Sequence, residues 1–339
     1  MLLRRLCNRG DCATHVDHKL TFGPIPSRRL GRSLGINNIP PKTCSYSCVY
    51  CQIGRTHPCR VQRRPYYDPV DVIDATRAKV RLAQEQGEQI DYLTVVPEGE
   101  PTLDANLGRD LWQLCGLGIK TAVITNASLL WRGDVRADLA AADWVSVKVD
   151  AVDPETWRRL NRPHPSLRME TILDGISQFA QEFPGELVTE TMLVAGINDD
   201  PQHLERVATF IGALEPQTAY LSVPTRPTAM LSAEQPDETS VTAAYQIFCN
   251  HTESVECLTG YEGNSFASTG NPVADLLSIT AVHPMKETAV QDLLSRSQSD
   301  WSVLRQLVAD GALIETRYRG ELFYARAHIR TGTNHRLNS

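Results

Sequence analysis

Three cysteines close together are the residues of this chain best suited to chemistry. Cys44, Cys48 and Cys51 are separated by three and then two residues, in a loop after Pro40-Pro41. Thiolates are the ligands that iron–sulfur clusters prefer, and three thiols within eight residues can surround one cluster at little cost in chain entropy. Three ligands for four irons leave one iron open, and an open position distinguishes a catalytic metal site from a structural one. The spacing therefore predicts a catalytic iron–sulfur cluster.

Two plainer interpretations of the same cysteines stay open. A structural zinc site needs a fourth ligand, which Cys59 or His57 could supply. Alternatively, the three cysteines are ordinary buried side chains, although the Ser, Tyr and Pro residues around them do not resemble a hydrophobic core. We favour the cluster, in view of the rest of the chain described below.

Short β-branched runs alternate with longer helical stretches over most of the chain. Asp68, Asp153 and Asp200 each precede a proline, which is typical of a helix N-cap followed by proline in the first turn. The expected strands lie at 32–39, 91–96, 119–125, 144–149, 186–194 and 218–223.

Strands that alternate with helices pair in parallel through right-handed crossovers. The expected fold is α/β, a partial (β/α)6 barrel over residues 20–260, because six units suit an open barrel better than a closed eight-fold one. A nearly flat, doubly wound sheet is the second choice. Residues 1–19 are treated as an N-terminal extension.

The chain changes character after Gly260. Residues 261–275 are rich in Gly, Asn and Ser and are expected to form a linker. Residues 276–330 predict short helices, the last from Asp300 to a stop at Gly311, and then a hairpin about Arg319-Gly320. Helices followed by a hairpin indicate a small winged-helix-like domain. The polar residues 331–339 are expected to be a disordered tail.

Polar residues follow the expected strands at their carboxyl ends, the rim where β/α barrels build active sites. They comprise Glu98–Pro101, Asn126, Lys148, Asp150, Asn198, Asp199 and Pro224–Pro227.

The cysteine loop also carries a family resemblance. The spacing with Tyr50 before the last cysteine resembles the signature of the radical S-adenosylmethionine (SAM) superfamily, and residues 22–56 resemble its bacterial branch of proteins similar to wyosine (tRNA-modifying) synthases. The resemblance spans about residues 20 to 270. It implies a [4Fe–4S] cluster on the three cysteines. It also implies an enzyme that reductively cleaves SAM to a 5′-deoxyadenosyl radical, with ferredoxin or flavodoxin as electron donor.

The resemblance also implies cofactor contacts. The Gly99-Glu100-Pro101 motif would hold the amino group of SAM, and Tyr50 would touch its adenine. The remaining candidates lie on or after the next strands. Asn126 belongs to the polar rim, and Ser146 and Lys148 lie in the region that resembles the family's ribose-contacting strand. Gly196 lies within 192–199, which resembles the motif beside the adenine and ribose, and Val223 would contact adenine through its backbone.

The substrate is expected to be RNA first, from the branch and from basic residues around the cysteine loop, and a peptide or protein second. Those basic side chains could equally be a solvated surface, and His164 either faces substrate or is an ordinary loop histidine. The basic residues are Arg28, Arg29, Arg32, Lys42, Arg55, Arg60, Arg63 and Arg64.

A different class of protein is the main rival: an iron–sulfur or zinc regulator that uses the winged-helix-like domain without catalysis. Sequence-specific DNA binding is not expected, because basic and acidic residues nearly cancel over 281–330 and phosphate neutralisation needs clustered cations.

The bulk composition is that of a globular protein, with 42% hydrophobic and 22% charged residues and a net charge of −6. No apolar run approaches the roughly 20 residues that span a bilayer. Nine cysteines without a disulfide pattern indicate reduced thiols and a cytoplasmic protein. Cys7 and Cys12 lack the spacing of a second cluster site, and Cys115, Cys249 and Cys257 are expected in the core.

Overall fold

The computed structural model describes residues 20–230, 232–259, 271–282 and 284–327. The expected extension 1–19, with Cys7 and Cys12, and the expected tail 331–339 lie outside the described residues. The expected linker 261–275 is wrong at its end, because helix α8 (Pro272–Val282) already begins there. The Asn271 side chain accepts a hydrogen bond from Ala274 N (3.1 Å), which caps that helix.

One eight-stranded sheet forms the larger part of the molecule. The strands are β1 (Thr21–Ser27), β2 (Gly31–Ile36), β3 (Tyr92–Val95), β4 (Lys120–Thr125), β5 (Trp144–Lys148), β6 (Glu186–Met192), β7 (Thr218–Ser222) and β8 (Val255–Leu258). Strands β2 to β8 are parallel, and β1 pairs antiparallel with β2. All six expected strands are present. Strands β1 and β8 were not expected: β1 contains two prolines, which are uncommon in strands, and β8 is only four residues long.

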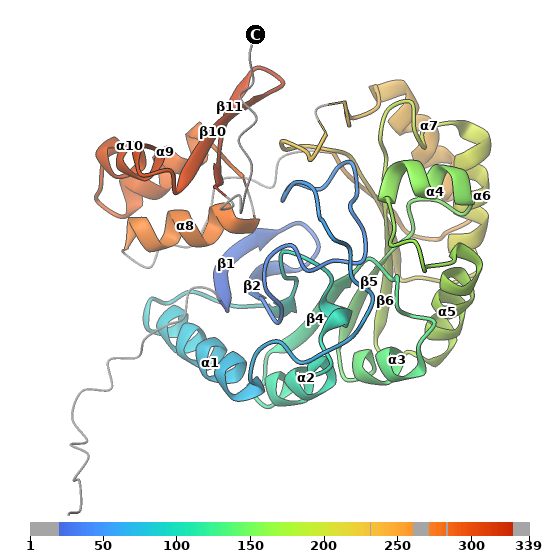
Figure 1. Cartoon of the computed structure of the whole chain (residues 1–339), viewed down its shortest axis with the longest axis horizontal. Coiled ribbons are helices and arrows are strands. Elements are labelled where there is room, and N and C mark those ends of the chain that lie inside the picture. The colour runs from blue at the N-terminus through green and yellow to red at the C-terminus, as the bar shows by residue number, and fades with distance from the viewer. Residues whose placement is uncertain (1–19, 231, 260–270, 283, 328–339) are drawn as a thin grey trace, which may run out of the picture.

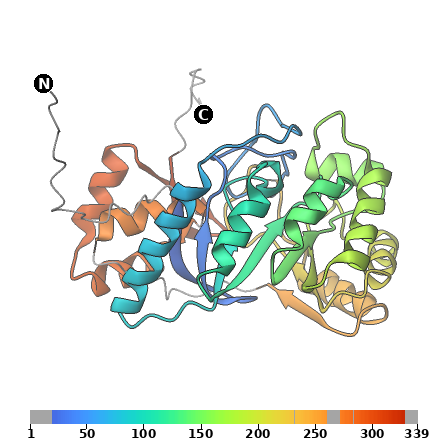
Figure 2. The same ribbon diagram turned by 90° about the horizontal axis from the view of Figure 1, so that it is seen from below.

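The strands follow one another across the sheet in chain order, from β1 to β8. Right-handed crossovers in a constant direction place every helix on the same face, so the sheet curls into an open half-barrel with the helices outside (Figures 1 and 2). A doubly wound sheet would reverse its strand order and carry helices on both faces. The outer helices are α1 (Pro69–Glu85), α2 (Leu107–Cys115), α3 (Gly133–Leu139), α4 (Pro154–Asn161), α5 (Met169–Glu182), α6 (Pro201–Gly212) and α7 (Glu238–Cys249), and a 3-10 turn spans Pro101–Leu103.

The three expected aspartate caps are confirmed. Asp68 accepts from Val70 N (2.9 Å), Asp153 from Thr156 N (2.9 Å) and Asp200 from Gln202 N (3.0 Å). Each cap satisfies a backbone donor that the first helical turn leaves free, and so fixes where the helix begins.

The inner face of the half-barrel changes from apolar to polar along the strands. Trp144, Val188 and Tyr220 belong to a buried cluster in the first half of their strands. Two residues further along, and therefore on the same face, the side chains are polar: Ser146, Glu190 and Ser222. The polar end is the carboxyl end, where the candidate site residues were expected.

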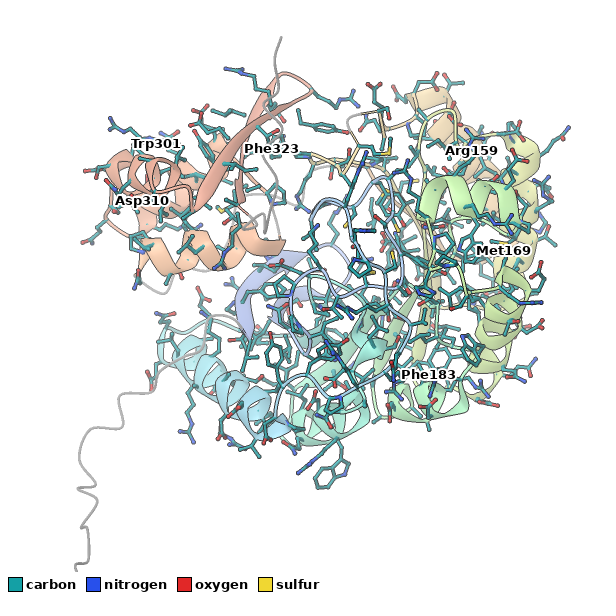
Figure 3. All side chains as sticks on the ribbon, in the orientation of Figure 1. Arg159, Met169, Phe183, Trp301, Asp310 and Phe323 are labelled. Carbon is teal, nitrogen blue, oxygen red and sulfur yellow. The ribbon has the colours of Figure 1, made fainter. Side chains whose placement is uncertain are left out.

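A C-terminal module lies at the β1 end of the sheet (Figures 1 and 2). Arg319 and Gly320 both have positive φ (51° and 82°) in its hairpin turn, and Gly311 (φ 68°) follows its last helix, as expected. The module comprises α8, β9 (Met285–Lys286), α9 (Glu287–Arg296), α10 (Trp301–Ala309), β10 (Leu313–Tyr318) and β11 (Glu321–Arg326), with a sheet in the order β10-β11-β9. Figure 3 labels Trp301 and Asp310 at the two ends of α10 and Phe323 in the hairpin.

The C-terminal module shares its core with the half-barrel. Phe22 and Ile25 of β1 are buried in one cluster with residues of the module that include Leu276, Met285 and Leu293. Gly35 on β2 makes room for this packing, because a Cβ there would lie 2.0 Å from the Phe22 ring. The module is therefore joined to the sheet by a common hydrophobic core and is not a separate unit.

One expectation about the cysteines is wrong. Cys115, Cys249 and Cys257 are exposed. The first two end helices on the outside of the molecule, and Cys257 lies on the edge strand β8, where one side of the sheet has no further strand to cover it. Among the described residues, no helix is both long and apolar enough to cross a membrane.

Candidate active site

The cysteine loop, residues 37–64, crosses the carboxyl end of the half-barrel. Backbone hydrogen bonds tie it to the loop after β3: Lys42 N donates to Glu98 O (2.8 Å), and Glu100 N donates to Thr43 O (2.9 Å). Gly99 lies between these two bonds. A Cβ at Gly99 would be 2.0 Å from Thr43 O, so only glycine allows the two loops to approach this closely.

The other side of the cysteine loop is tied to the end of α4 and to the loop after β7. Val49 N donates to Leu160 O (2.9 Å), and Met230 N donates to Val49 O (3.1 Å). In Figure 3 this loop lies between the C-terminal module, where Phe323 is labelled, and helices α4 and α5, where Arg159 and Met169 are labelled. The loop is thus held from both sides of the half-barrel.

The three thiols are half-buried, and two of them accept amide hydrogen bonds. Asn126 Nδ2 lies 3.5 Å from Cys44 Sγ, and Asn161 Nδ2 lies 3.5 Å from Cys48 Sγ. Burial raises the pKa of Cys51 and Cys44, and that of Cys48 to about 12. Ionised thiolates at these positions therefore need stabilisation by a positive metal centre and by N–H donors. The amide groups of Asn126 and Asn161 provide such donors. The residues fit an iron–sulfur cluster.

Glu100 uses its carboxylate within the protein. Its oxygens accept from Thr102 N (3.1 Å), Thr102 Oγ1 (2.6 Å), Thr125 Oγ1 (2.6 Å) and Asn126 N (2.7 Å), and the side chain is buried. The resemblance implied that the Gly99-Glu100-Pro101 motif contacts SAM. The structure shows that the Glu100 carboxylate binds Thr125 and Asn126 at the end of β4, and Thr102 in the 3-10 turn that follows Glu100. It thereby holds the backbone of the motif and the position of Asn126.

Tyr50 points into a buried polar group beside Cys48. Its hydroxyl donates to Asp150 Oδ2, and Asn161 Nδ2 donates to the same oxygen (2.7 Å) while also lying 3.2 Å from the Tyr50 hydroxyl. Asp150 Oδ1 accepts from Met192 N (2.9 Å). Tyr50, Asp150 and Asn161 therefore link the cysteine loop to β6 and α4.

Lys148 lies inside the half-barrel with Glu190 and Arg29. Lys148 Nζ is 3.1 Å from Glu190 Oε1, which also accepts from Ser222 Oγ (2.9 Å), and Arg29 pairs with the other Glu190 oxygen. Burial acts to lower the pKa of Lys148, but Glu190 and Asp150 outweigh it and raise that pKa. Lys148 Nζ also lies 5.0 Å from the centre of the Tyr50 ring, a cation–π distance.

The remaining sequence candidates occupy different depths. Ser146 is buried on the inner face, and its hydroxyl has no hydrogen-bond partner among the described residues. Gly196 (φ 66°) is exposed in a turn, whereas Val223 is buried against the outer helices, so only its backbone can face the interior. Asn198 fixes the Gly196 turn, since its side chain bonds Val194 N (2.8 Å) and Met192 O (2.9 Å).

Most of the basic side chains around the cysteine loop are used for internal contacts. Besides Arg29, Arg32 pairs with Glu88 (3.4 Å), and Arg63 pairs with Asp134 (2.8 Å) and Asp138. His164 Nδ1 bonds Ser166 Oγ (2.8 Å), and its backbone N–H donates to Ser45 O (2.9 Å), so the ring is held within its own loop. Of the basic residues predicted to surround the cysteine loop, Lys42 and Arg55 line a cavity.

That cavity, of about 800 Å³, lies between the cysteine loop and the C-terminal module. Residues Gln52–Arg55 directly after the third cysteine form one side, the loop at Pro227–Ala229 forms another, and hairpin residues such as Ile314 and Thr316 form the third. An occupant of this cavity would therefore lie beside the cysteines and in contact with the module.

Sequence reasoning missed Asn161, Glu190 and Ser222 as members of the site. Glu190 carried a signal, because a carboxylate in the interior of a strand expected in a buried parallel sheet indicates an inward polar contact. Asn161 carried none, since asparagine at the end of a helix is common.

Comparison with known proteins agrees with this architecture. The model of the radical SAM superfamily matches residues 38–211. A UPF0026 protein of Methanocaldococcus jannaschii is 42% identical over 309 residues, which cover 91% of this chain and 96% of that protein. A UPF0026 protein of Synechocystis is 38% identical over 208 residues, covering 61% and 76%.

Solved structures share the fold at low identity. TYW1 with a lysine-pyruvate adduct bound has a TM-score of 0.51 at 16% identity, with 65% of this chain and 74% of that chain covered. SuiB of Streptococcus suis has a TM-score of 0.50 at 13% identity, covering 69% and 54%. The chain belongs to the radical SAM superfamily and is an enzyme of that superfamily, which implies use of SAM and an iron–sulfur cluster.

Proposed function

We propose that this enzyme holds a [4Fe–4S] cluster on Cys44, Cys48 and Cys51 and reductively cleaves SAM. The observation that carries the proposal is the placement of these thiols on one loop across the carboxyl end of the half-barrel, with amide donors at two sulfurs. When bound, the cluster and SAM supply a 5′-deoxyadenosyl radical that abstracts a hydrogen atom from the substrate.

The chain's own residues orient the cofactors. The three thiolates would hold the cluster through three of its irons, and Asn126 and Asn161 would stabilise the charge on two of the sulfurs. The paired carboxylates and cations inside the barrel keep each charge neutralised away from water. The buried interior thus limits the access of water to a reactive species.

The cofactor contacts follow the same geometry. SAM would lie against the backbone of Gly99-Glu100-Pro101, with the Glu100 side chain acting through that backbone. The unpartnered Ser146 hydroxyl and the Lys148 ammonium offer polar contacts from β5. The other proposed contacts are Tyr50, Asn126, Gly196 and Val223.

The proposed electron donor is a ferredoxin or flavodoxin, and the substrate classes that the resemblance favours are RNA and then peptide or protein. The hairpin of the C-terminal module borders the cavity next to the cysteine loop, which supports a role of this winged-helix-like module in substrate binding. A regulator without catalysis needs neither this cavity nor a polar barrel interior.

Anaerobic reconstitution tests the proposal. We expect the native chain to take up four iron and four sulfide per molecule, and to form 5′-deoxyadenosine and methionine from SAM with dithionite. The Cys44→Ala/Cys48→Ala/Cys51→Ala variant should lose both the iron and the product. Cys115→Ala, which removes an exposed thiol on α2, is the matched control and should retain both.

Two results would contradict the proposal. One is a full iron complement in the triple variant; the other is a single zinc without sulfide in the native chain, which would favour the regulator. Cluster-loaded native protein that forms no 5′-deoxyadenosine would contradict SAM cleavage alone.

A further inference from the structure

The cavity between the cysteine loop and the C-terminal module has an unusual charge. Lys42, Arg55 and Arg326 line it, and none of the described lining residues is Asp or Glu. Glu98 is buried, and burial raises its pKa to about 7, whereas the positive charges of Arg326 and Lys42 act to lower that pKa. Lys42 faces Glu98 and the thiols of Cys51 and Cys44, so its charge is balanced within the site. Arg55 and Arg326 are the cations that give the cavity a positive lining, in a chain whose net charge is −6.

The donors of these cations are available. Arg55 is exposed, and within the described part of the chain its side chain has no hydrogen bond or ion pair. Lys42 Nζ is fully buried and faces Glu98 and two of the thiols, so it supports the site from beneath the cavity surface. Arg326 Nη1 donates to Leu277 O (3.2 Å), and a guanidinium has five N–H donors, so others stay available. Arg55 and Arg326 can therefore both donate to one anionic ligand in the cavity.

The size and the lining of the cavity narrow the ligand further. A volume of about 800 Å³ lies in the range of sites for small molecules. The described lining contains no Phe, Tyr or Trp, the side chains on which single-stranded nucleic acids stack their bases. Both features favour a small molecule over the RNA or peptide substrate that the family resemblance alone suggests.

We propose that this cavity is the substrate site and binds a small polyanion, a phosphate ester or a polycarboxylate. Arg55 contacts it from the cysteine loop and Arg326 from the C-terminal module. Guanidinium groups suit this task, because their planar donors bind phosphate and carboxylate in pairs. The assignment of the ligand as substrate rests on the proposed function, whereas anion binding itself does not.

Calorimetric titration of the full, cluster-reconstituted chain tests the proposal, with saturating SAM and without reductant. The probes are inorganic pyrophosphate, citrate and an unmodified ten-nucleotide RNA. Pyrophosphate or citrate should bind, and the stronger of the two identifies the phosphate or carboxylate class. Arg55→Gln and Arg326→Gln should each weaken that binding about ten-fold, because each removes a charge-assisted contact.

Arg317→Gln is the matched control. Arg317 is an exposed arginine on the same hairpin and is not among the residues that line the cavity. The affinity of Arg317→Gln for the small anion should stay within about two-fold of the native value. Thermal unfolding checks that Arg326→Gln still folds, and Arg55 has no partner whose loss could unfold the chain.

Three outcomes would overturn the proposal: no binding of either small anion, equal weakening by Arg317→Gln, or RNA binding that exceeds both anions and survives Arg326→Gln. Displacement of the anion by SAM would also overturn it, because the site would then belong to the cofactor. Failure of SAM cleavage with intact anion binding would contradict the proposed function and leave the polyanion site standing.

Discussion

At the scale of single residues, buried charges in this chain are paired with few exceptions. Glu190 lies between Arg29 and Lys148. Burial acts to raise the pKa of Glu190, but these two cations outweigh burial and hold that pKa well below its usual range. Asp110 differs. It is 2% exposed, and neither carboxylate oxygen has a hydrogen-bond partner among the described residues.

Asp110 therefore predicts a pH-dependent stability. Burial, with Asp104 adding to it, raises the pKa of Asp110 to about 8. The folded chain thus holds this proton more tightly than the unfolded chain, whose Asp pKa is about 3.9, and the free energy of unfolding falls as the pH rises from about 4 to about 8. Asp110→Asn removes this titration. From pH 5 to pH 8, the stability of this variant relative to the native chain should rise by about 3 to 4 kcal/mol.

Urea unfolding at the two pH values measures this difference. Asp174→Asn, at an exposed position on α5, is the control and should show no pH-dependent gain. An Asp110→Asn variant whose stability relative to the native chain is the same at both pH values would show that this carboxyl group is ionised at little cost.

At the scale of elements, the site depends on close contact between two loops. The cysteine loop and the loop after β3 meet at Gly99, and neither is part of a strand or helix. Each is positioned because the strand before it, β2 or β3, ends at the same edge of the sheet. The parallel sheet therefore sets where the thiols lie, and the backbone hydrogen bonds set how closely the two loops approach.

Gly99→Ala tests this contact. The added methyl group would overlap Thr43 O, so the loops must separate, at a cost of about 2 kcal/mol for an overpacked contact. We expect a lower unfolding midpoint and less iron retained after reconstitution. Gly133→Ala, whose Cβ would meet only Arg136 at 3.9 Å, is the matched control. Native-like iron retention by Gly99→Ala would mean that the loops bind the cluster without this close approach.

At the scale of the whole molecule, the C-terminal module and the half-barrel form one body. Phe22 of β1 is 2% exposed within the cluster that it shares with the module. Phe22→Ala should destabilise the chain by about 3 to 5 kcal/mol, and both parts should still unfold in a single transition. Trp112→Ala, at a 73% exposed position on α2, should change stability little.

Calorimetry and the near-ultraviolet signal report the two parts together. Two separate transitions in Phe22→Ala would show that the shared core does not couple the module to the sheet. The same coupling means that removal of residues 272–339 would expose Phe22 and Ile25, so a truncated chain is not a suitable test of the half-barrel alone.

The sequence by itself determined the local features. The cysteine spacing, the aspartate caps, six of the eight strands of the half-barrel and the Arg319-Gly320 turn each depend on residues near in the chain, and the structure bears out the caps, the strands and the turn. Only the tertiary structure decided contacts between distant segments. It placed the Glu100 carboxylate on β4, the Asn161 amide on Cys48, and Arg326 across a cavity from Arg55. These pairings arise because a curled parallel sheet gathers the ends of all its strands at one edge, and no local pattern encodes which side chains then meet.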